Sequence, residues 1–133
     1  MKYVVTGGAG FIGSNLVDKL IDDNHEVYII DNLSTGKIDN CNDKAIFYNI
    51  DISDEKSLMS LKEIFSDADT VFHCAASARV QPSILNPIKF EKNNTIGLIN
   101  SLKCSVDSNV RRFIYSASSS AYGPTDKLPS KET

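Results

Sequence analysis

The sequence has few of the residues that build disulfide frameworks or metal centres. Its three cysteines, Cys41, Cys74 and Cys104, are odd in number and widely spaced, and they fit neither a disulfide framework nor a C-x-x-C metal motif. The two histidines, His25 and His73, lie far apart in the sequence, which argues against a zinc site. We therefore expect no metal, reduced cysteines and a cytoplasmic protein.

The sequence also lacks long basic runs and long apolar runs. Its net charge is −3 and 41% of its residues are hydrophobic, which is ordinary for a soluble globular protein. Without a basic patch we expect no nucleic-acid partner. No apolar stretch approaches the roughly 18 residues that a membrane-spanning helix needs, so we expect no membrane partner. Met1 and Lys2 lead directly into an apolar run, so we also expect no signal peptide.

The most informative stretch is a glycine-rich turn that follows the apolar run 3–5 and opens a helix. Gly7 permits a tight turn, Gly10 lets a pyrophosphate approach the backbone, and Gly13 lets the helix pack closely on the strand. The free N–H groups at the start of the helix would face the phosphates. Taken alone, this spacing also fits a tight strand–helix turn that binds nothing. The helix that follows and the acid after the next strand favour a dinucleotide site. The apolar residues of this amphipathic helix are Phe11, Ile12, Leu16, Val17, Leu20 and Ile21.

Short apolar runs alternate with helical patterns along the whole chain. The runs show no clean alternation of polar and apolar residues, which is typical of strands buried on both faces of a parallel sheet. We therefore predict one α/β domain over residues 1–133, a doubly wound parallel sheet (a Rossmann fold) with strand order 3-2-1-4-5, truncated after its fifth strand. The expected strands are at about 2–6, 26–30, 45–50, 70–74 and 111–117, the helices at about 11–23, 54–65 and 87–107, and the loops at 34–43 and 123–133.

Two acids follow the second and third predicted strands. Asp31 is placed to accept hydrogen bonds from an adenosine ribose and to repel a 2′-phosphate, which favours NAD over NADP, although Lys37 weakens that exclusion. The other interpretation of Asp31 is a turn or cap residue. Asp51 lies where an acid can meet the adenine amino group, or it caps the helix that begins near Asp54. The residues alone leave both alternatives open.

The fourth predicted strand ends in His73, Cys74, Ala75 and Ala76. The small residues would let a cofactor lie against the backbone. We interpret His73 as a packed or hydrogen-bonded structural residue rather than a catalytic one.

Five segments in this order and spacing carry a resemblance to a known family: TGGAGFIG, Asp31-Asn32, HCAA, Asn93–Gly97 and Ser116–Gly123. Over all 133 residues the chain resembles the N-terminal part of the extended short-chain dehydrogenase/reductases. Within that family it is most similar to the NAD-dependent nucleotide-sugar epimerases of the UDP-glucose 4-epimerase kind, with UDP-N-acetylglucosamine as the other substrate considered. Such enzymes transfer hydride through a 4-keto sugar, and NAD supplies the redox chemistry.

The resemblance also implies a role for individual residues. The backbone N–H groups of Phe11 and Ile12 would bind the pyrophosphate, Asp31 and Asn32 would bind the adenosine end, and Asp51 and Ile52 would bind the adenine. Cys74, Ala75 and Ala76 would line the cofactor, and Asn94 would reach it. Ser118 would be the catalytic serine. From the residues alone, Asn94 is a solvated helix residue and Ser118 belongs to a serine-rich strand end.

The triplet Ser118–Ser120 favours epimerisation over dehydration. Related dehydratases resemble this segment but carry Thr-Asp-Glu there, and related decarboxylases carry a glutamate. Three hydroxyls can hydrogen-bond a sugar but cannot act as acid and base at neutral pH.

The sequence departs from the family's pattern in one respect. The acid–base pair Tyr-x-x-x-Lys would begin near position 143, about 25 residues beyond the serine, and residues 1–133 do not contain it. Tyr115 and Tyr122 are followed four residues later by Ser119 and Asp126, and Lys127 comes one residue too late. We therefore expect no catalysis by these residues alone. The nucleotide-sugar substrate would belong to the longer enzyme.

Other classes remain open: a non-catalytic NAD-binding regulatory module, a dehydratase, or an interaction protein on a degenerate Rossmann scaffold. In the family, the helix at about 87–107 builds a dimer interface. Its apolar residues Phe90, Ile96, Ile99 and Leu102, with Phe113 and Tyr115 on the sheet beside it, predict a homo-oligomer.

Overall fold

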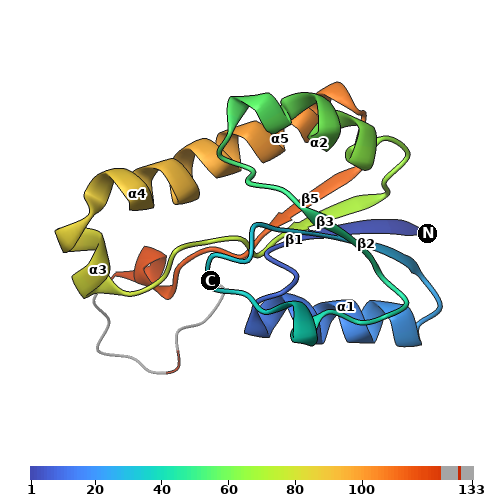
Figure 1. Cartoon of the computed structure of the whole chain (residues 1–133), viewed down its shortest axis with the longest axis horizontal. Helices are drawn as coiled ribbons and strands as arrows, with labels where there is room; N and C mark the ends of the chain where they lie inside the picture. Colours follow the sequence, from blue (N-terminus) through green and yellow to red (C-terminus); the bar gives the residue numbers. More distant parts are fainter. Residues whose placement is uncertain (124–128, 130–133) are drawn as a thin grey trace.

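The computed structural model of the chain describes residues 1–123 and 129. Its centre is one five-stranded parallel sheet in the order β3-β2-β1-β4-β5 (Figure 1). The strands are β1 (Lys2–Thr6), β2 (Glu26–Asp31), β3 (Ile46–Asn49), β4 (Thr70–His73) and β5 (Arg112–Tyr115). The predicted fold class, strand order and parallel pairing are therefore confirmed.

Helices cover both faces of the sheet (Figure 1). They are α1 (Phe11–Asp22), α2 (Leu58–Phe65), α3 (Val80–Leu85), α4 (Pro87–Glu91) and α5 (Gly97–Asp107), with short helical turns η1 (Ile38–Asn40), η2 (Glu55–Ser57), η3 (Lys92–Ile96) and η4 (Ser119–Tyr122). On one face, Val17 and Leu20 of α1 pack against Val5 and Ile29. On the other, α2 and α5 enclose a second core built around Phe65. Because both faces are covered, the strands need no alternation of polar and apolar residues.

The helix predicted at 87–107 is a continuous run of α4, the π-helical turn η3 and α5. The sequence analysis missed α3. Pro82 obscured it, but this proline lies in the first turn of the helix, where a missing backbone N–H costs nothing. Most of the loop predicted at 123–133, Lys127 included, lies outside the described residues.

The apolar face predicted for the first helix is wrong at two positions. Phe11 is 84% exposed and Ile12 is 67% exposed. The residues of α1 that are buried are Gly13, Ser14, Val17 and Leu20. Successive residues of a helix lie about 100° apart, so the face that contains Val17 and Leu20 directs positions 11 and 12 to solvent.

Among the described residues no helix is long and apolar enough to cross a bilayer. In the same part of the chain no three His, Cys, Asp or Glu residues come close enough to hold a metal ion.

Candidate functional site

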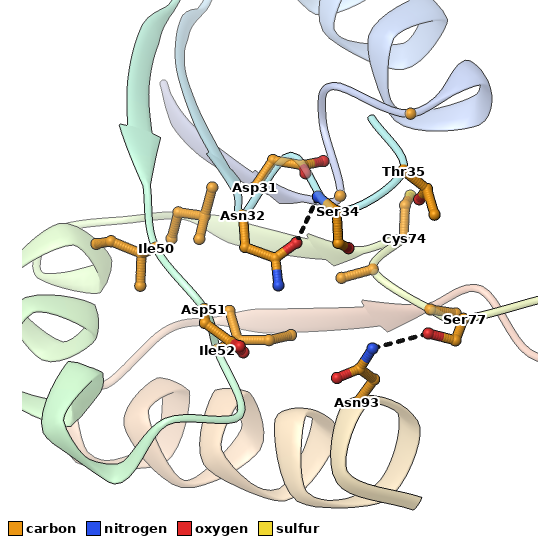
Figure 2. A pocket seen from close by; sticks show the side chains of 15 residues that line it. Asp31, Asn32, Ser34, Thr35, Ile50, Asp51, Ile52, Cys74, Ser77 and Asn93 are labelled. Atoms are coloured by element: carbon orange, nitrogen blue, oxygen red, sulfur yellow. Dashed lines mark hydrogen bonds between the residues drawn. The ribbon is translucent and has the colours of Figure 1, made fainter. Parts of the chain in front are cut away.

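The described residues form a groove at the carboxyl edge of the sheet, where β1 lies between β2 and β4 (Figure 2). The chain leaves β1 toward β2 on one side and reaches β4 on the other, so this is the topological switch point at which doubly wound sheets bind ligands. The empty space in the groove is about 570 Å³, including the open solvent at its mouth. Residues after β1, β2, β3 and β4 line it, together with one residue of η3.

Close packing requires glycine at two positions of the motif after β1, Gly7 and Gly13. Gly7 has a φ of +71°, and a Cβ there would lie 2.6 Å from the backbone nitrogen of Ala75. A Cβ on Gly13 would lie 2.2 Å from the carbonyl oxygen of Gly7, so the first turn of α1 packs at this position against the glycine turn. A Cβ on Gly10 would meet only that same oxygen, at 3.2 Å. Gly10 therefore presents open backbone to the groove.

The start of α1 has no side-chain cap. Gly10 is its N-cap residue, no side chain accepts a hydrogen bond there, and the first turn contains no acid. The first backbone N–H groups of a helix have no partner within the helix and carry the positive end of its dipole. The side chains of Phe11 and Ile12 are exposed and do not cover the N-terminal end of the helix, so an anion can approach its free N–H groups.

Asp31, at the end of β2, is bonded to the glycine turn. Its Oδ2 accepts a hydrogen bond from the N–H of Ala9 at 3.1 Å, and its Oδ1 accepts one from the N–H of Leu33 at 2.8 Å. The carbonyl of Ala9 in turn accepts bonds from the N–H of Lys37 at 3.1 Å and from Nδ2 of Asn40 at 2.9 Å. Asp31 is thus a turn residue, and its carboxylate oxygens still have lone pairs for a ligand in the groove.

Asp51 lines the groove after β3. Its Oδ1 accepts bonds from the N–H and Oγ of Ser53, at 2.8 and 2.6 Å. Burial acts to raise the pKa of Asp51, but the hydrogen bonds from Ser53 and Asn32 and the charge of Lys92 outweigh it, so the pKa lies below its usual 3.8. The capping role proposed for Asp51 falls instead to Asp54, which caps η2.

Ile52 has one side in the groove and one in the core. It is 7% exposed and packs with the residues between the sheet, α2 and α5. A Cβ on Gly97 would lie 3.0 Å from Cγ1 of Ile52, so this glycine allows the start of α5 to approach the groove wall. Nδ2 of Asn100 donates to the carbonyl of Ile52 at 2.9 Å.

The wall after β4 consists of Cys74, Ala75, Ala76 and Ser77. Asn94 is not among the described residues that line the groove, and its carboxamide bonds the backbone of Ser77. Asn93 lines it instead, and Figure 2 shows its bond to Ser77. The sequence analysis missed both Asn93 and Ser77 as site residues. The pair Asn93-Asn94 is apparent in the sequence, but its hydrogen-bond partner Ser77 lies 16 to 17 residues earlier and could not be inferred from it.

His73 lies beneath this wall and is 1% exposed. Its Nδ1 is 2.9 Å from Oγ1 of Thr6, and its Nε2 is buried without a hydrogen-bond partner among the described residues. Burial lowers the pKa of His73 to about 4, so the ring is neutral at pH 7. The prediction of a packed structural histidine is confirmed.

Ser118 follows β5 and is exposed. Its side chain accepts a hydrogen bond from the N–H of Ser120 at 3.1 Å and so caps η4. It does not line the groove formed by the described residues. Its catalytic role stays a prediction.

The chain is similar to several UDP-glucose 4-epimerases in sequence and in fold. The UDP-glucose 4-epimerase of Streptococcus mutans is 37% identical over 134 residues, which cover 100% of this chain and 40% of that protein. The crystal structure of UDP-glucose 4-epimerase from Thermotoga maritima with UDP-glucose is 42% identical, with a TM-score of 0.87 over 96% of this chain and 41% of that one. The UDP-glucose 4-epimerase of Thermus thermophilus in complex with NAD is 34% identical, with a TM-score of 0.79 over 85% of this chain and 36% of that one.

The chain thus spans about 40% of the length of the curated relatives that it matches. The pattern that defines the NAD dependent epimerase/dehydratase family matches residues 3–133. Family membership therefore rests on nearly the whole chain, and it agrees with the parallel sheet and the glycine turn at its switch point. The chain belongs to the NAD dependent epimerase/dehydratase family.

Proposed function

We propose that residues 1–133 form the NAD-binding part of a nucleotide-sugar 4-epimerase. The observation that carries this proposal is the hydrogen bond between Asp31 and Ala9. It joins an acid in the position that binds the adenosine ribose to a glycine turn at the switch point of the sheet. The site fits a dinucleotide: Gly10 presents open backbone, and the start of α1 has no side-chain cap. When bound, NAD supplies reversible oxidation of a sugar carbon.

Each part of the groove suits one part of the cofactor. The N–H groups of Phe11 and Ile12 would bind the pyrophosphate at the helix N-terminus. Asp31 and Asn32 would hold the adenosine ribose, and the carboxylate of Asp31 would disfavour a 2′-phosphate.

The remaining walls would hold the adenine and the middle of the cofactor. Asp51, held in place by Ser53, would accept a bond from the adenine amino group beside Ile52. The small side chains of Cys74, Ala75 and Ala76 would let the cofactor lie along the wall after β4.

Sugar chemistry belongs to the longer protein in this proposal. Ser118 would hydrogen-bond the reacting sugar oxygen, and the triplet Ser118–Ser120 favours epimerisation over dehydration. Residues 1–133 contain no Tyr-x-x-x-Lys pair, so they lack a group to take up the sugar hydroxyl proton. We therefore expect no interconversion of UDP-glucose and UDP-galactose, or of their N-acetylated forms, by this chain alone.

Calorimetric titration of the chain with NAD and NADP tests the cofactor role. We expect binding of both, with NAD the tighter. Tighter binding of NADP would contradict the assignment of Asp31, and no binding of either at millimolar concentration would refute the proposed function. A coupled assay for UDP-galactose on the same preparation, with NAD added, tests the expected inactivity.

A further inference from the structure

The segment after β4 forms a wall of the groove without belonging to a strand or helix. The N–H of Cys74 still bonds the carbonyl of Thr6 at 3.0 Å, as a continuing strand would. Beyond it, the backbone reaches its next anchor at Ser77. Arg79 then adopts a φ of +87°, which residues other than glycine rarely do and which persists only where the surroundings hold it.

Ser77 is held by two consecutive asparagines. Oδ1 of Asn94 accepts a bond from the N–H of Ser77 at 2.7 Å, and Nδ2 of Asn94 donates to the carbonyl of Ser77 at 3.0 Å. Nδ2 of Asn93 donates to Oγ of Ser77 at 2.8 Å (Figure 2). The carboxamide of Asn94 thus offers Ser77 the acceptor and the donor that a peptide group of a neighbouring strand would offer.

The helix that carries these asparagines has an irregular turn at this place. Residues Lys92–Ile96 form the π-helical turn η3, between α4 and α5. Single π turns inside α-helices often occur at functional sites. Just after it, a Cβ on Gly97 would lie 3.0 Å from Cγ1 of Ile52, so the start of α5 lies close against the groove wall after β3. The turn therefore connects two groove walls, one after β3 and one after β4.

We propose that Asn94 is a positioning residue, which holds the Cys74–Ser77 wall of the cofactor groove through the backbone of Ser77. This inference rests on the proposed NAD site. Both polar ends of the Asn94 carboxamide bond Ser77, and Asn94 is not among the described residues that line the groove, so we expect its effect on the cofactor to pass through the wall. Asn93, which lines the groove, secures the Ser77 side chain from the same turn.

Three variants of the 133-residue chain test this. Asn94→Ala removes both bonds to the backbone of Ser77. Asn94→Asp keeps an acceptor for the N–H of Ser77 but loses the donor to the carbonyl of Ser77. Thr95→Ala, at the next position of the same turn and exposed, is the matched control. For each, NMR measures amide hydrogen exchange at Ser77 without ligand, and calorimetry measures the affinity for NAD. Unchanged exchange of the β1 amides verifies that each variant is folded.

We expect the Ser77 amide of Asn94→Ala to exchange at least about tenfold faster and NAD to bind about tenfold more weakly, the scale of one to two neutral hydrogen bonds. Asn94→Asp should retain much of the Ser77 protection and show an intermediate affinity. Thr95→Ala should match the parent in both measurements.

Two results would overturn the proposal. Weaker NAD binding by Asn94→Ala with Ser77 exchange unchanged would mean that Asn94 contacts the cofactor directly. Faster Ser77 exchange with unchanged NAD affinity would mean that the wall does not position the cofactor. If the parent chain binds no NAD, the proposed function fails and the positioning role with it. The exchange of Ser77 in the free chain then still reports whether the Asn94 contact exists.

Discussion

The Oδ2 of Asp31 accepts a hydrogen bond from the backbone N–H of Ala9 at 3.1 Å, across two neighbouring parallel strands. This bond joins the acid at the end of β2 to the glycine turn after β1. In the proposed function these two elements bind different parts of NAD, the ribose and the pyrophosphate. Under that proposal, discrimination between NAD and NADP would be coupled to the shape of the phosphate site.

The first prediction concerns Asp31→Ala. This variant should reduce the preference for NAD over NADP and lower the free energy of unfolding by about 2 kcal/mol, because the N–H groups of Ala9 and Leu33 lose a charged acceptor. Calorimetry gives the affinities and urea denaturation the stability. Asp39→Ala removes the same charge from an exposed position and should change neither. Unaltered stability of Asp31→Ala would contradict the coupling.

A pair of glycine variants should separate binding from folding. Gly10→Ala adds a Cβ that meets only the carbonyl oxygen of Gly7, at 3.2 Å, so the fold should tolerate it. The methyl group should nevertheless keep the pyrophosphate from the backbone and weaken NAD binding about tenfold or more. Gly13→Ala places its Cβ 2.2 Å from the Gly7 oxygen and should cost about 3 kcal/mol of folding stability. If Gly10→Ala bound NAD as the parent does, the phosphate site would lie elsewhere.

The folding stability of the chain should decrease as the pH is lowered, because of His73. Its pKa is about 4 in the folded chain, below the ordinary 6.5, so the unfolded chain binds the proton more tightly. The neutral ring therefore contributes its full stability above pH 6.5, and that contribution is lost as the pH falls toward 4. Between pH 7 and pH 5 we expect a loss of about 2 kcal/mol.

Urea denaturation at several pH values measures this loss. The loss should disappear in His73→Gln and persist in His25→Gln, whose histidine is only half-buried. The carboxylates with lowered pKa values, Asp51, Asp69 and Asp107, titrate below their usual 3.8 and so do not affect this window. An equal slope in His73→Gln and the parent would rule out His73 as the source.

The last prediction is self-association through the exposed apolar residues of α5 and of Ile96, the last residue of η3. Ile96, Ile99, Leu102 and Val106 are exposed at three- and four-residue spacing, and Tyr115 of β5 is exposed as well. Contiguous apolar surface of this kind tends to find a partner. Light scattering should show oligomers, and Ile99→Glu should weaken the association roughly tenfold or more.

Met59→Glu is the matched control for that experiment. Met59 is exposed on α2, outside the α5 surface, so its change should leave the association intact. A monodisperse monomer of the parent chain at high concentration would contradict the prediction.

The sequence alone was sufficient to predict the parallel sheet and the residues at the ends of its strands. The doubly buried strands are continuous apolar runs, which predict a parallel sheet covered by helices on both faces. The strand order follows from the doubly wound arrangement that is typical of a glycine-rich turn after the first strand. Gly7, Asp31, Asp51 and Cys74 each come at or directly after a strand end, and parallel strands bring such ends to one edge.

Tertiary structure alone decided how those residues are used. The sequence analysis counted Phe11 and Ile12 among the apolar residues of an amphipathic helix, but the face of α1 that packs on the sheet contains Val17 and Leu20, and positions 11 and 12 are exposed. Asn94 is suited to solvent or to a ligand by its chemistry, yet it bonds Ser77, 17 residues away. A polar side chain bonds whichever group the fold places within about 3 Å of it. That distance depends on how β4, α3 and η3 pack together, which no short stretch of sequence encodes.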